Sequence, residues 1–310
     1  MSIRRCAITV SDAGEFGLIA RVTSRLPQGA QVIVGPGDDA AVVAAPDHRV
    51  VISTDLLVEG RHFRRDWSSA TDIGHKAAAQ SLADIAAMGA TATAIVVGLA
   101  APDDLPLEWA DELTDGLRAE CDRTGASVVG GDVVAAPLVL ISVTALGDLT
   151  GQAPVLRSGA QPGDVVVCTG GLGASTAGLR ALQSGDAGNP HVRAHQRPRP
   201  PYSLGPALAR AGATSMVDTS DGLLADLGHV ATASGVGIEL DLALVRTAAA
   251  DGVEDADALS GGEDHALVAT LPALASVPRG CSVIGRVVVG SGVRVDGAEW
   301  SGAAGWEHYR

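Results

Sequence analysis

Residues 215–234 read SMVDTSDGLLADLGHVATAS, and this stretch decides the class of fold. Its first four residues, with Met216 and Val217 at their centre, predict a short strand that ends at Asp218. From residue 221 onward the apolar side chains recur at helical spacing, which predicts a helix over 221–234. The residues on its apolar face are Leu223, Leu224, Leu227, Val230 and Ala231. The stretch is therefore a strand, an acidic turn and a helix, and the chain belongs to the mixed α/β class (α+β).

The same alternation extends outward in both directions. We expect further strands at 50–53, 93–99, 138–146, 165–168, 261–271, 283–289 and 293–295, and helices at 72–88, 107–123, 173–183 and 202–211. Asp72 is a candidate cap for its helix, and Gly89 suits the left-handed position after its end. Residues 191–201 carry three prolines and are predicted to be extended. A stretch rich in Gly, Pro and Ala at 147–163 suggests two domains, 1–148 and 149–310.

Composition excludes several classes of protein. The 310 residues hold 22 Lys and Arg against 36 Asp and Glu, a formal charge of −14, with only four Trp, two Tyr and two Phe. A nucleic-acid partner is therefore not expected. No apolar run is long enough to cross a membrane, so we expect no membrane association. The cysteines lie far apart without a CxxC motif, which is typical of reduced thiols in a cytoplasmic protein; they are Cys6, Cys121, Cys168 and Cys281.

Two common nucleotide-binding motifs are missing or weak. Lys76 is the only lysine and is not preceded by a GxxxxG loop, which excludes a P-loop and a protein-kinase strand lysine. We expect Lys76 to pair with a carboxylate, with contact to a phosphate as the alternative. Residues 35–40 read GPGDDA and fit G-x-G-x-x-A, but the aspartates would face a bound pyrophosphate and no long helix follows. A dinucleotide fold is therefore not expected.

Carboxylates gather in short turns of small residues, at predicted strand ends. The turns read GDD at 37–39, STD at 53–55, GGD at 130–132, DTSD at 218–221 and GGED at 261–264, and Asp84 adds a carboxylate inside a helix of small residues. A single Asp after Gly is usually a turn former. If several of these carboxylates converge, a divalent cation must neutralise them, and oxygen ligands without His or Cys favour Mg²⁺ over zinc. Mg²⁺ in turn suggests polyphosphate and phosphoryl transfer without a P-loop.

Taken together, these segments resemble the thiamine-monophosphate kinase family, in the superfamily of aminoimidazole ribonucleotide synthetase and selenophosphate synthetase. The matching segments are Gly14-Glu15-Phe16, GDDAAVV at 37–43, STDLLVEGRHF at 53–63, SLADIAAMGA at 81–90, VGGD at 129–132, RSGAQPGD at 157–164, DTSDGLLADLGH at 218–229, SGGEDHALV at 260–268 and GWEHY at 305–309. These segments follow one another in the family's order and span nearly the whole chain. The STD-x-LVEG-x-HF segment and the closing GWEHY favour the thiamine branch.

The resemblance implies a phosphotransferase that moves the γ-phosphoryl group of ATP onto thiamine monophosphate, giving thiamine diphosphate by direct in-line transfer assisted by several Mg²⁺ ions. It also implies a two-domain PurM-like fold. Residues 1–148 would bind ATP and Mg²⁺ and form a homodimer through their sheet, and 149–310 would complete the substrate cleft. The implied metal ligands are Asp39, Ser53, Thr54, Asp55, Asp84, Asp132, Asp218 and Asp221, of which Asp55, Asp132, Asp218 and Asp221 would be catalytic.

The resemblance assigns further residues to the two substrates. Gly131, Asp132, Arg157 and Ser220 would contact ATP, and His62, Glu263 and Trp306 would hold thiamine monophosphate. The chemistry agrees, because an indole stacks on a cationic ring and a guanidinium binds phosphate in a fork. Arg61, beside His62, is an alternative phosphate ligand.

Three positions depart from the family pattern. Val133 and His265 replace a usual Thr and a common Tyr, and Pro201 stands where Arg is common. None of these departures removes an implied metal ligand.

Two other functions stay open at the level of sequence. One is another ATP-dependent reaction of the superfamily, such as ring closure or selenophosphate synthesis, for which Cys6 is the one N-terminal candidate thiol. The other is a non-catalytic protein that senses or sequesters a nucleotide or a thiamine phosphate. Turnover of thiamine monophosphate separates both from the kinase.

Overall fold

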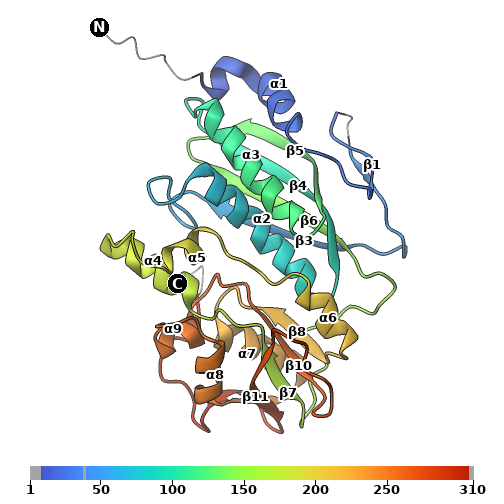
Figure 1. Cartoon of the computed structure of the whole chain (residues 1–310), viewed down its shortest axis with the longest axis vertical. Helices are drawn as coiled ribbons and strands as arrows, with labels where there is room; N and C mark the ends of the chain where they lie inside the picture. The colour runs from blue at the N-terminus through green and yellow to red at the C-terminus, as the bar shows by residue number, and fades with distance from the viewer. Residues whose placement is uncertain (1–7, 38–39, 307–310) are drawn as a thin grey trace. The chain divides into compact units, whose positions relative to one another are not determined.

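A computed structural model describes residues 8–37 and 40–306, which divide into two compact units (Figure 1). The first unit comprises Met1–Ser81 and Ala92–Asp148, and the second comprises Leu82–Thr91 and Leu149–Arg310. This division differs from a cut after residue 148 in one segment, 82–91, which packs with the second unit. The roles that the sequence assigns to the two halves stay predictions. Within the described residues no helix is both long and apolar enough to span a membrane.

The first unit is built on a four-stranded mixed sheet in the order β3-β6-β4-β5. Its elements are α1 (Val10–Thr23), β1 (Val32–Val34), β2 (Val42–Val43), β3 (Val51–Val58), α2 (Ala70–Ala87, which continues into the second unit), β4 (Thr91–Ala101), α3 (Leu107–Asp122), β5 (Ser127–Ala135) and β6 (Leu140–Asp148). β3 and β6 are antiparallel, whereas β4 and β5 are parallel. In this order β6, the strand expected at 138–146, is an inner strand.

Helices α2 and α3 lie on the same face of this sheet and touch through their backbones (Figure 1). A Cβ atom added at Gly74 would lie 2.2 Å from the carbonyl oxygen of Leu113, and one added at Gly116 would lie 2.2 Å from that of Thr71. Only glycine permits such an approach. The start of α2 is capped by Ser69, whose hydroxyl accepts from the Asp72 amide while the Asp72 carboxylate accepts from Ser69. Asp72 is thus the third residue of a capping box and not the cap itself.

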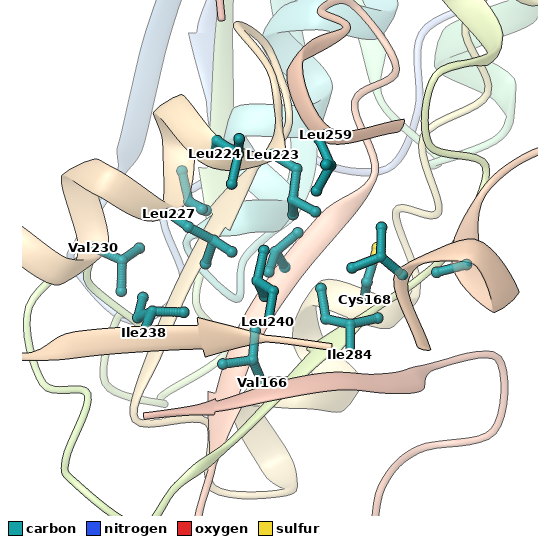
Figure 2. Close-up of a cluster of buried hydrophobic side chains, with 14 of the residues drawn as sticks. Val166, Cys168, Leu223, Leu224, Leu227, Val230, Ile238, Leu240, Leu259 and Ile284 are labelled. Carbon is teal, nitrogen blue, oxygen red and sulfur yellow. The ribbon is translucent and has the colours of Figure 1, made fainter. Parts of the chain in front are cut away.

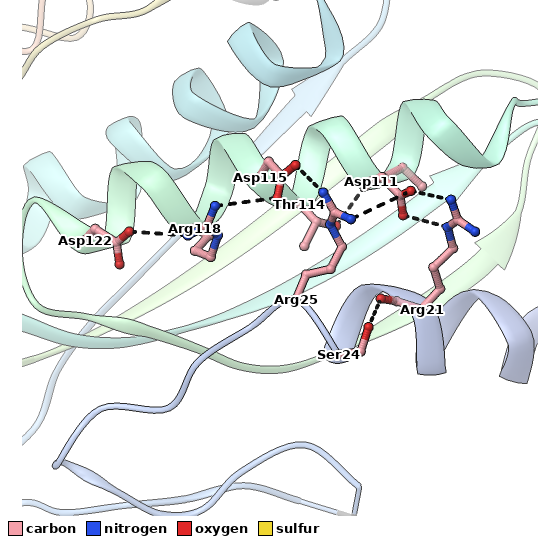
Figure 3. A network of polar contacts seen from close by, with 9 residues as sticks. Arg21, Ser24, Arg25, Asp111, Thr114, Asp115, Arg118 and Asp122 are labelled. Atoms are coloured by element: carbon pink, nitrogen blue, oxygen red, sulfur yellow. Dashed lines mark hydrogen bonds and ion pairs between the residues drawn. The ribbon is translucent and has the colours of Figure 1, made fainter.

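Ion pairs join α1 to α3 on the outside of the first unit (Figure 3). The guanidinium of Arg21 donates to both oxygens of Asp111, at 2.8 and 2.5 Å, and Arg25 pairs with Asp115. The Arg21 guanidinium lowers the pKa of the Asp111 carboxyl below its ordinary value, because a bidentate cation favours the ionised form. Leu18 is buried beneath these pairs and packs on Leu107 and Ala110 of α3.

The second unit holds a six-stranded sheet in the order β12-β9-β11-β7-β10-β8. Its elements are β7 (Val165–Cys168), α4 (Ala174–Ser184), α5 (Val192–Gln196), α6 (Leu204–Arg210), β8 (Ser215–Asp218), α7 (Leu223–Ser234), β9 (Gly237–Leu240), α8 (Leu242–Ala248), α9 (Asp255–Ser260), β10 (Leu267–Leu271), β11 (Ser282–Val288) and β12 (Gly292–Val295). All pairings are antiparallel except β12 with β9.

Apolar side chains cover both faces of this second sheet. Val166 and Cys168 of β7 join the core under α7, α8 and α9, which Figure 2 shows. The intervening residue, Val167, points to the opposite face and packs with Leu208 of α6 and Ala86 at the end of α2. Because successive residues of a strand alternate between faces, a run of buried residues marks a strand that is covered on both sides.

The structure corrects four predictions of local structure. The strand expected at 50–53 continues to Val58, because β3 stays paired with β6 up to that residue. The Gly-Gly-Asp segment expected in a turn lies inside β5, because β5 stays paired with β4 through it. Residues 191–201 are not wholly extended, since α5 forms before the first of the three prolines. Residues 261–266 precede β10 as an irregular segment rather than as its first part.

Candidate active site

The predicted Ser-Thr-Asp triplet is divided between the two faces of β3. Asp55 lies on the face covered by α2, where Ser81 donates a hydrogen bond of 2.6 Å to its carboxylate. The Ser81 hydroxyl also lies 3.1 Å from the carbonyl oxygen of Val143, so it is fixed between two acceptors. Thr54 points to the uncovered face and bonds to Thr144 at 3.0 Å. Ser53 shares the face of Asp55 because side chains alternate along a strand.

Gly131 and Asp132 lie side by side on β5, next to β4. A Cβ atom at Gly131 would lie 2.0 Å from the carbonyl oxygen of Val97, so glycine is required for the two strands to pair here. Asp132 is exposed, and one of its oxygens accepts from the amide of Val133 at 2.9 Å. The other oxygen of this carboxylate makes no hydrogen bond to the residues that the structure describes.

His62 sits in the turn that follows β3 and is half-buried. Its Nδ1 accepts from the amide of Val58 at 3.0 Å, which fixes the ring and leaves Nε2 to carry the proton. Lys76 is only 2% exposed, and its ammonium group donates to the carbonyl oxygen of His62 at 3.0 Å. The sequence suggested a carboxylate partner for Lys76, and this backbone carbonyl was not foreseen.

In the second unit the predicted residues Asp218, Ser220, Asp221, Glu263 and Trp306 are brought together around one loop. The loop follows β8 and receives two distant segments. The amide of Glu263 donates to the carbonyl oxygen of Ser220 at 2.8 Å, and the amide of Trp306 donates to that of Asp221 at 2.9 Å. A Cβ atom at Gly305 would lie 2.5 Å from the Asp221 carbonyl oxygen, so only glycine allows this approach. Three stretches of sequence thus meet at the site.

The carboxylate of Asp218 is buried beside His265. His265 Nδ1 lies 2.9 Å from an oxygen of Asp218, and both side chains are almost fully buried. Burial lowers the pKa of His265, but the hydrogen bond and the charge of Asp218, with smaller effects of Glu263 and Asp84, outweigh it and hold this pKa above its ordinary value. Asp84, on the part of α2 that belongs to the second unit, therefore acts on the same imidazole.

Asp226 fixes the loop that follows β8 through hydrogen bonds to its backbone. The sequence did not predict this role. One of its oxygens accepts from the amides of Asp221 and Gly222, at 3.2 and 3.0 Å. Burial, together with the charges of Asp218 and Asp221, raises the pKa of Asp226 to about 7. The sequence presented Asp226 as one more polar residue of a helix, and only the folded loop reveals its contacts.

Asp264 anchors the other side of the site to α4. Its carboxylate accepts from the amides of Gly173 and Ser175, at 2.5 and 2.8 Å, and so satisfies the exposed donors at the start of that helix. Burial raises the pKa of Asp264 to about 7. Its neighbour Glu263 reaches His195, whose Nδ1 lies 3.4 Å from the carboxylate. These contacts fix Glu263 beside the loop that follows β8.

Arg157 lies away from this group within the second unit. Its carbonyl oxygen accepts from the hydroxyl of Ser234, at the last residue of α7. Asp221 precedes the opposite end of this 12-residue helix, which is about 18 Å long. The exposed guanidinium of Arg157 bonds to no residue that the structure describes. An ATP contact by Arg157 stays a prediction.

The donor set fits a hard cation, although the carboxylates do not form one compact cluster. Over residues 8–37 and 40–306, no group of three His, Cys, Asp or Glu side chains is close enough to hold a metal ion. Mg²⁺ commonly keeps several waters and takes only one or two carboxylates, so this spread is compatible with it. The negative charges of Asp218 and Asp221 act on Asp226, and a divalent cation bound beside them would offset these charges. Asp39, Cys6 and residues 307–309 lie outside the described residues.

Comparison with known proteins finds matches over most of the chain. Models of AIR synthase related proteins match the chain in two parts, the N-terminal domain over residues 37–149 and the C-terminal domain over 161–297. A thiamine-monophosphate kinase of Mycobacterium tuberculosis (strain CDC 1551 / Oshkosh) is 50% identical over 312 residues, covering 97% of this chain and 93% of that protein.

Solved structures match over similar lengths. The thiamine-monophosphate kinase of Stenotrophomonas maltophilia K279a is 34% identical with a TM-score of 0.78, covering 91% of this chain and 96% of the other. A structure described as AaThiL complexed with AMPPCP and TMP is 31% identical with a TM-score of 0.78, covering 96% and 98%.

Proposed function

The chain belongs to the thiamine-monophosphate kinase family, and from that premise we propose that it phosphorylates thiamine monophosphate with ATP to give thiamine diphosphate. The observation that carries the proposal is the loop at the end of β8, where Asp218, Ser220, Asp221, Glu263 and Trp306 gather from three parts of the sequence. The relative solved with AMPPCP and TMP supports a nucleotide and a thiamine phosphate as the two substrates.

We assign the residues of this loop to the two reactants. The exposed indole of Trp306 stacks on the flat cationic ring of thiamine, and Glu263 accepts a hydrogen bond from its amino group. Ser220, with Gly131, Asp132 and Arg157, contacts ATP. His62 presents a proton on Nε2 to the phosphate of thiamine monophosphate, because its Nδ1 is occupied by the Val58 amide.

Mg²⁺ ions are proposed at the carboxylates that the family pattern marks. Asp55 and Asp132, with Ser53 and Thr54, would serve in the first unit, and Asp84, Asp218 and Asp221 in the second; Asp39 is added from the sequence. Of the first group, Thr54 would act from the uncovered face or through its backbone, since its hydroxyl bonds to Thr144. When bound, Mg²⁺ screens the repulsion between the two polyanions and orients in-line attack.

This reaction needs no strong general base from the protein. The attacking phosphate has a second pKa near 6 and is largely anionic at pH 7, so its oxygen is already a nucleophile. Positioning is then the main task of the protein. Ser81 fixes Asp55, and Asp226 fixes the amides of the Asp221 turn. We propose direct transfer without a phosphorylated intermediate of the protein.

We further propose a homodimer that forms through the uncovered face of the first sheet. The face exposes Ile52, Leu56, Val96 and Val134, of which Ile52 is 66% and Leu56 54% exposed. An apolar patch of this kind is typical of an interface. A cytoplasmic location is proposed from the cysteines, since Cys121, Cys168 and Cys281 are free thiols and burial raises the pKa of Cys168 to about 12.

The activity is tested by incubating the full chain with ATP, Mg²⁺ and thiamine monophosphate and converting the product to fluorescent thiochrome. Product is expected only with the monophosphate and Mg²⁺, and free thiamine should give none. Asp55→Asn and Asp221→Asn should each lower kcat by orders of magnitude, whereas Asp186→Asn, an exposed carboxylate in a loop, should leave it unchanged. Wild-type turnover in both site variants would refute the assignment of the carboxylates, and ATP binding without turnover would favour a sensor.

A further inference from the structure

His265 is held against the site by an unusual set of contacts. Its Nδ1 faces a carboxylate oxygen of Asp218 at 2.9 Å, and because a carboxylate only accepts, Nδ1 carries the proton. The backbone on both sides of the ring is tied to the same loop. The amide of His265 donates to the carbonyl oxygen of Thr219 at 3.0 Å, and the amide of Ala266 donates to the Thr219 hydroxyl at 3.0 Å. The imidazole therefore cannot move independently of Asp218.

This arrangement is costly for a residue that only fills space. His265 Nε2 is buried and has no hydrogen-bond partner within the described residues. The backbone of His265 has a φ of +51°, in the left-handed region that strains residues other than glycine, although His, Asn and Asp adopt it more often than the rest. An apolar residue would avoid the unsatisfied nitrogen, and a glycine would avoid the strain. What the imidazole adds, and these residues lack, is the hydrogen bond to Asp218.

We infer that His265 is a positioning residue, which holds the Asp218 carboxylate in the orientation that binds a divalent cation at the proposed kinase site. The inference rests on the proposed function. With one oxygen of Asp218 committed to Nδ1, the carboxylate cannot rotate freely, and its other oxygen keeps a fixed direction. Loss of a group that orients a ligand in this way typically weakens metal binding 10- to 100-fold.

Two substitutions of His265 separate the hydrogen bond from packing. His265→Asn places an amide nitrogen close to the position of Nδ1, and Asn tolerates a left-handed backbone. His265→Leu has a similar size and no donor. Val268→Ala on β10 is the matched control, because Val268 is buried in the core of the second unit and pairs with Val217 of β8 rather than with Asp218.

The readout is the binding of Mn²⁺ to the full chain in the presence of AMPPCP, followed by the electron paramagnetic resonance signal of free Mn²⁺. We expect His265→Leu to raise the Kd of Mn²⁺ by about 10- to 100-fold and His265→Asn to stay within about 3-fold of wild type. Val268→Ala should lower the Tm without changing this Kd. At saturating metal, the loss of kcat in His265→Leu should be smaller than the change in Kd.

A double substitution provides an independent check. If His265 acts through Asp218, His265→Leu should add little to the loss of Mn²⁺ affinity that Asp218→Asn already causes. Losses that multiply in the double variant would overturn the inference. If His265→Leu does not fold, His265→Gln takes its place, because its amide lies one methylene further from the backbone.

The remaining outcomes are also decisive. Mn²⁺ binding as tight as wild type in the Leu or Gln variant would overturn the inference, as would a loss in the Asn variant equal to that in the Leu variant. A wild-type chain that binds no Mn²⁺ with AMPPCP would overturn it too. A wild-type chain that binds Mn²⁺ but makes no thiamine diphosphate would instead refute the proposed function, and the comparison of Kd values would still judge His265.

Discussion

Replacing Gly74 by alanine tests the backbone contact between α2 and α3. The new Cβ atom would lie 2.2 Å from the Leu113 carbonyl oxygen and 2.9 Å from the Leu117 amide nitrogen, so one helix must move. In an unhindered helix the same change would gain about 1 kcal/mol. Overpacking costs typically 1–3 kcal/mol, and the upper value applies because both obstructing atoms are backbone. The net expectation is a loss of about 2 kcal/mol in the free energy of unfolding.

A second helical glycine supplies the opposite expectation. A Cβ atom at Gly228 of α7 would meet nothing within 4 Å, so Gly228→Ala should raise the free energy of unfolding by up to about 1 kcal/mol. Urea unfolding followed by circular dichroism measures both, and the Tm of Gly74→Ala should fall by about 4–8 °C. Because α2 carries Ser81, which bonds to Asp55, turnover should fall as well. If Gly74→Ala proves as stable as Gly228→Ala, the close crossing is not real.

Three further predictions concern the site, the interface and pH. Ser81→Ala removes a buried donor from Asp55 and should cost about 1–3 kcal/mol of stability and lower kcat, as measured by unfolding and the thiochrome assay; an unchanged kcat would deny Ser81 a positioning role. Leu56→Glu should convert a dimer to a monomer in light scattering, whereas Leu274→Glu, at a 100% exposed residue, should not, and equal masses for both would refute the interface. Burial raises the pKa of Asp264 from 3.8 to about 7, so the folded state binds more protons than the unfolded state, and the free energy of unfolding falls as pH rises from about 4 to about 7. Asp264→Asn should flatten this dependence of the unfolding free energy on pH, and an unaltered dependence would contradict the shift.

The fold class and the family were predicted correctly from the sequence, because both depend on local patterns. The strand, acidic turn and helix over 215–234 appear where apolar spacing placed them, with Asp218 closing β8. The convergence of Glu263 and Trp306 on this loop followed only from the resemblance. No local pattern encodes the hydrogen bonds between residues more than 40 positions apart that create it.

The errors came from residues whose environment is set by distant strands. The two glycines at 130 and 131 suggested a turn, yet Gly131 is needed for β5 to pair with β4. Thr54 and Asp55 were expected in one turn, but the strand continues through them and points their side chains to opposite faces. The roles of Asp226 and His265 were missed because their partners are backbone amides and a buried carboxylate brought close by folding.

The burial of Lys76 determines how this protein reacts with amine-directed reagents. The chain has one lysine, which is 2% exposed, and its ammonium group donates to a carbonyl oxygen. Activated esters and aldehyde cross-linkers attack accessible, unprotonated amines, so the folded chain offers them no side-chain target. Labelling for single-molecule work, or coupling to an amine-reactive support, should therefore leave Lys76 unmodified while the first unit is folded. A label on Lys76 would appear only after the first unit unfolds, which makes lysine labelling a selective probe of that opening.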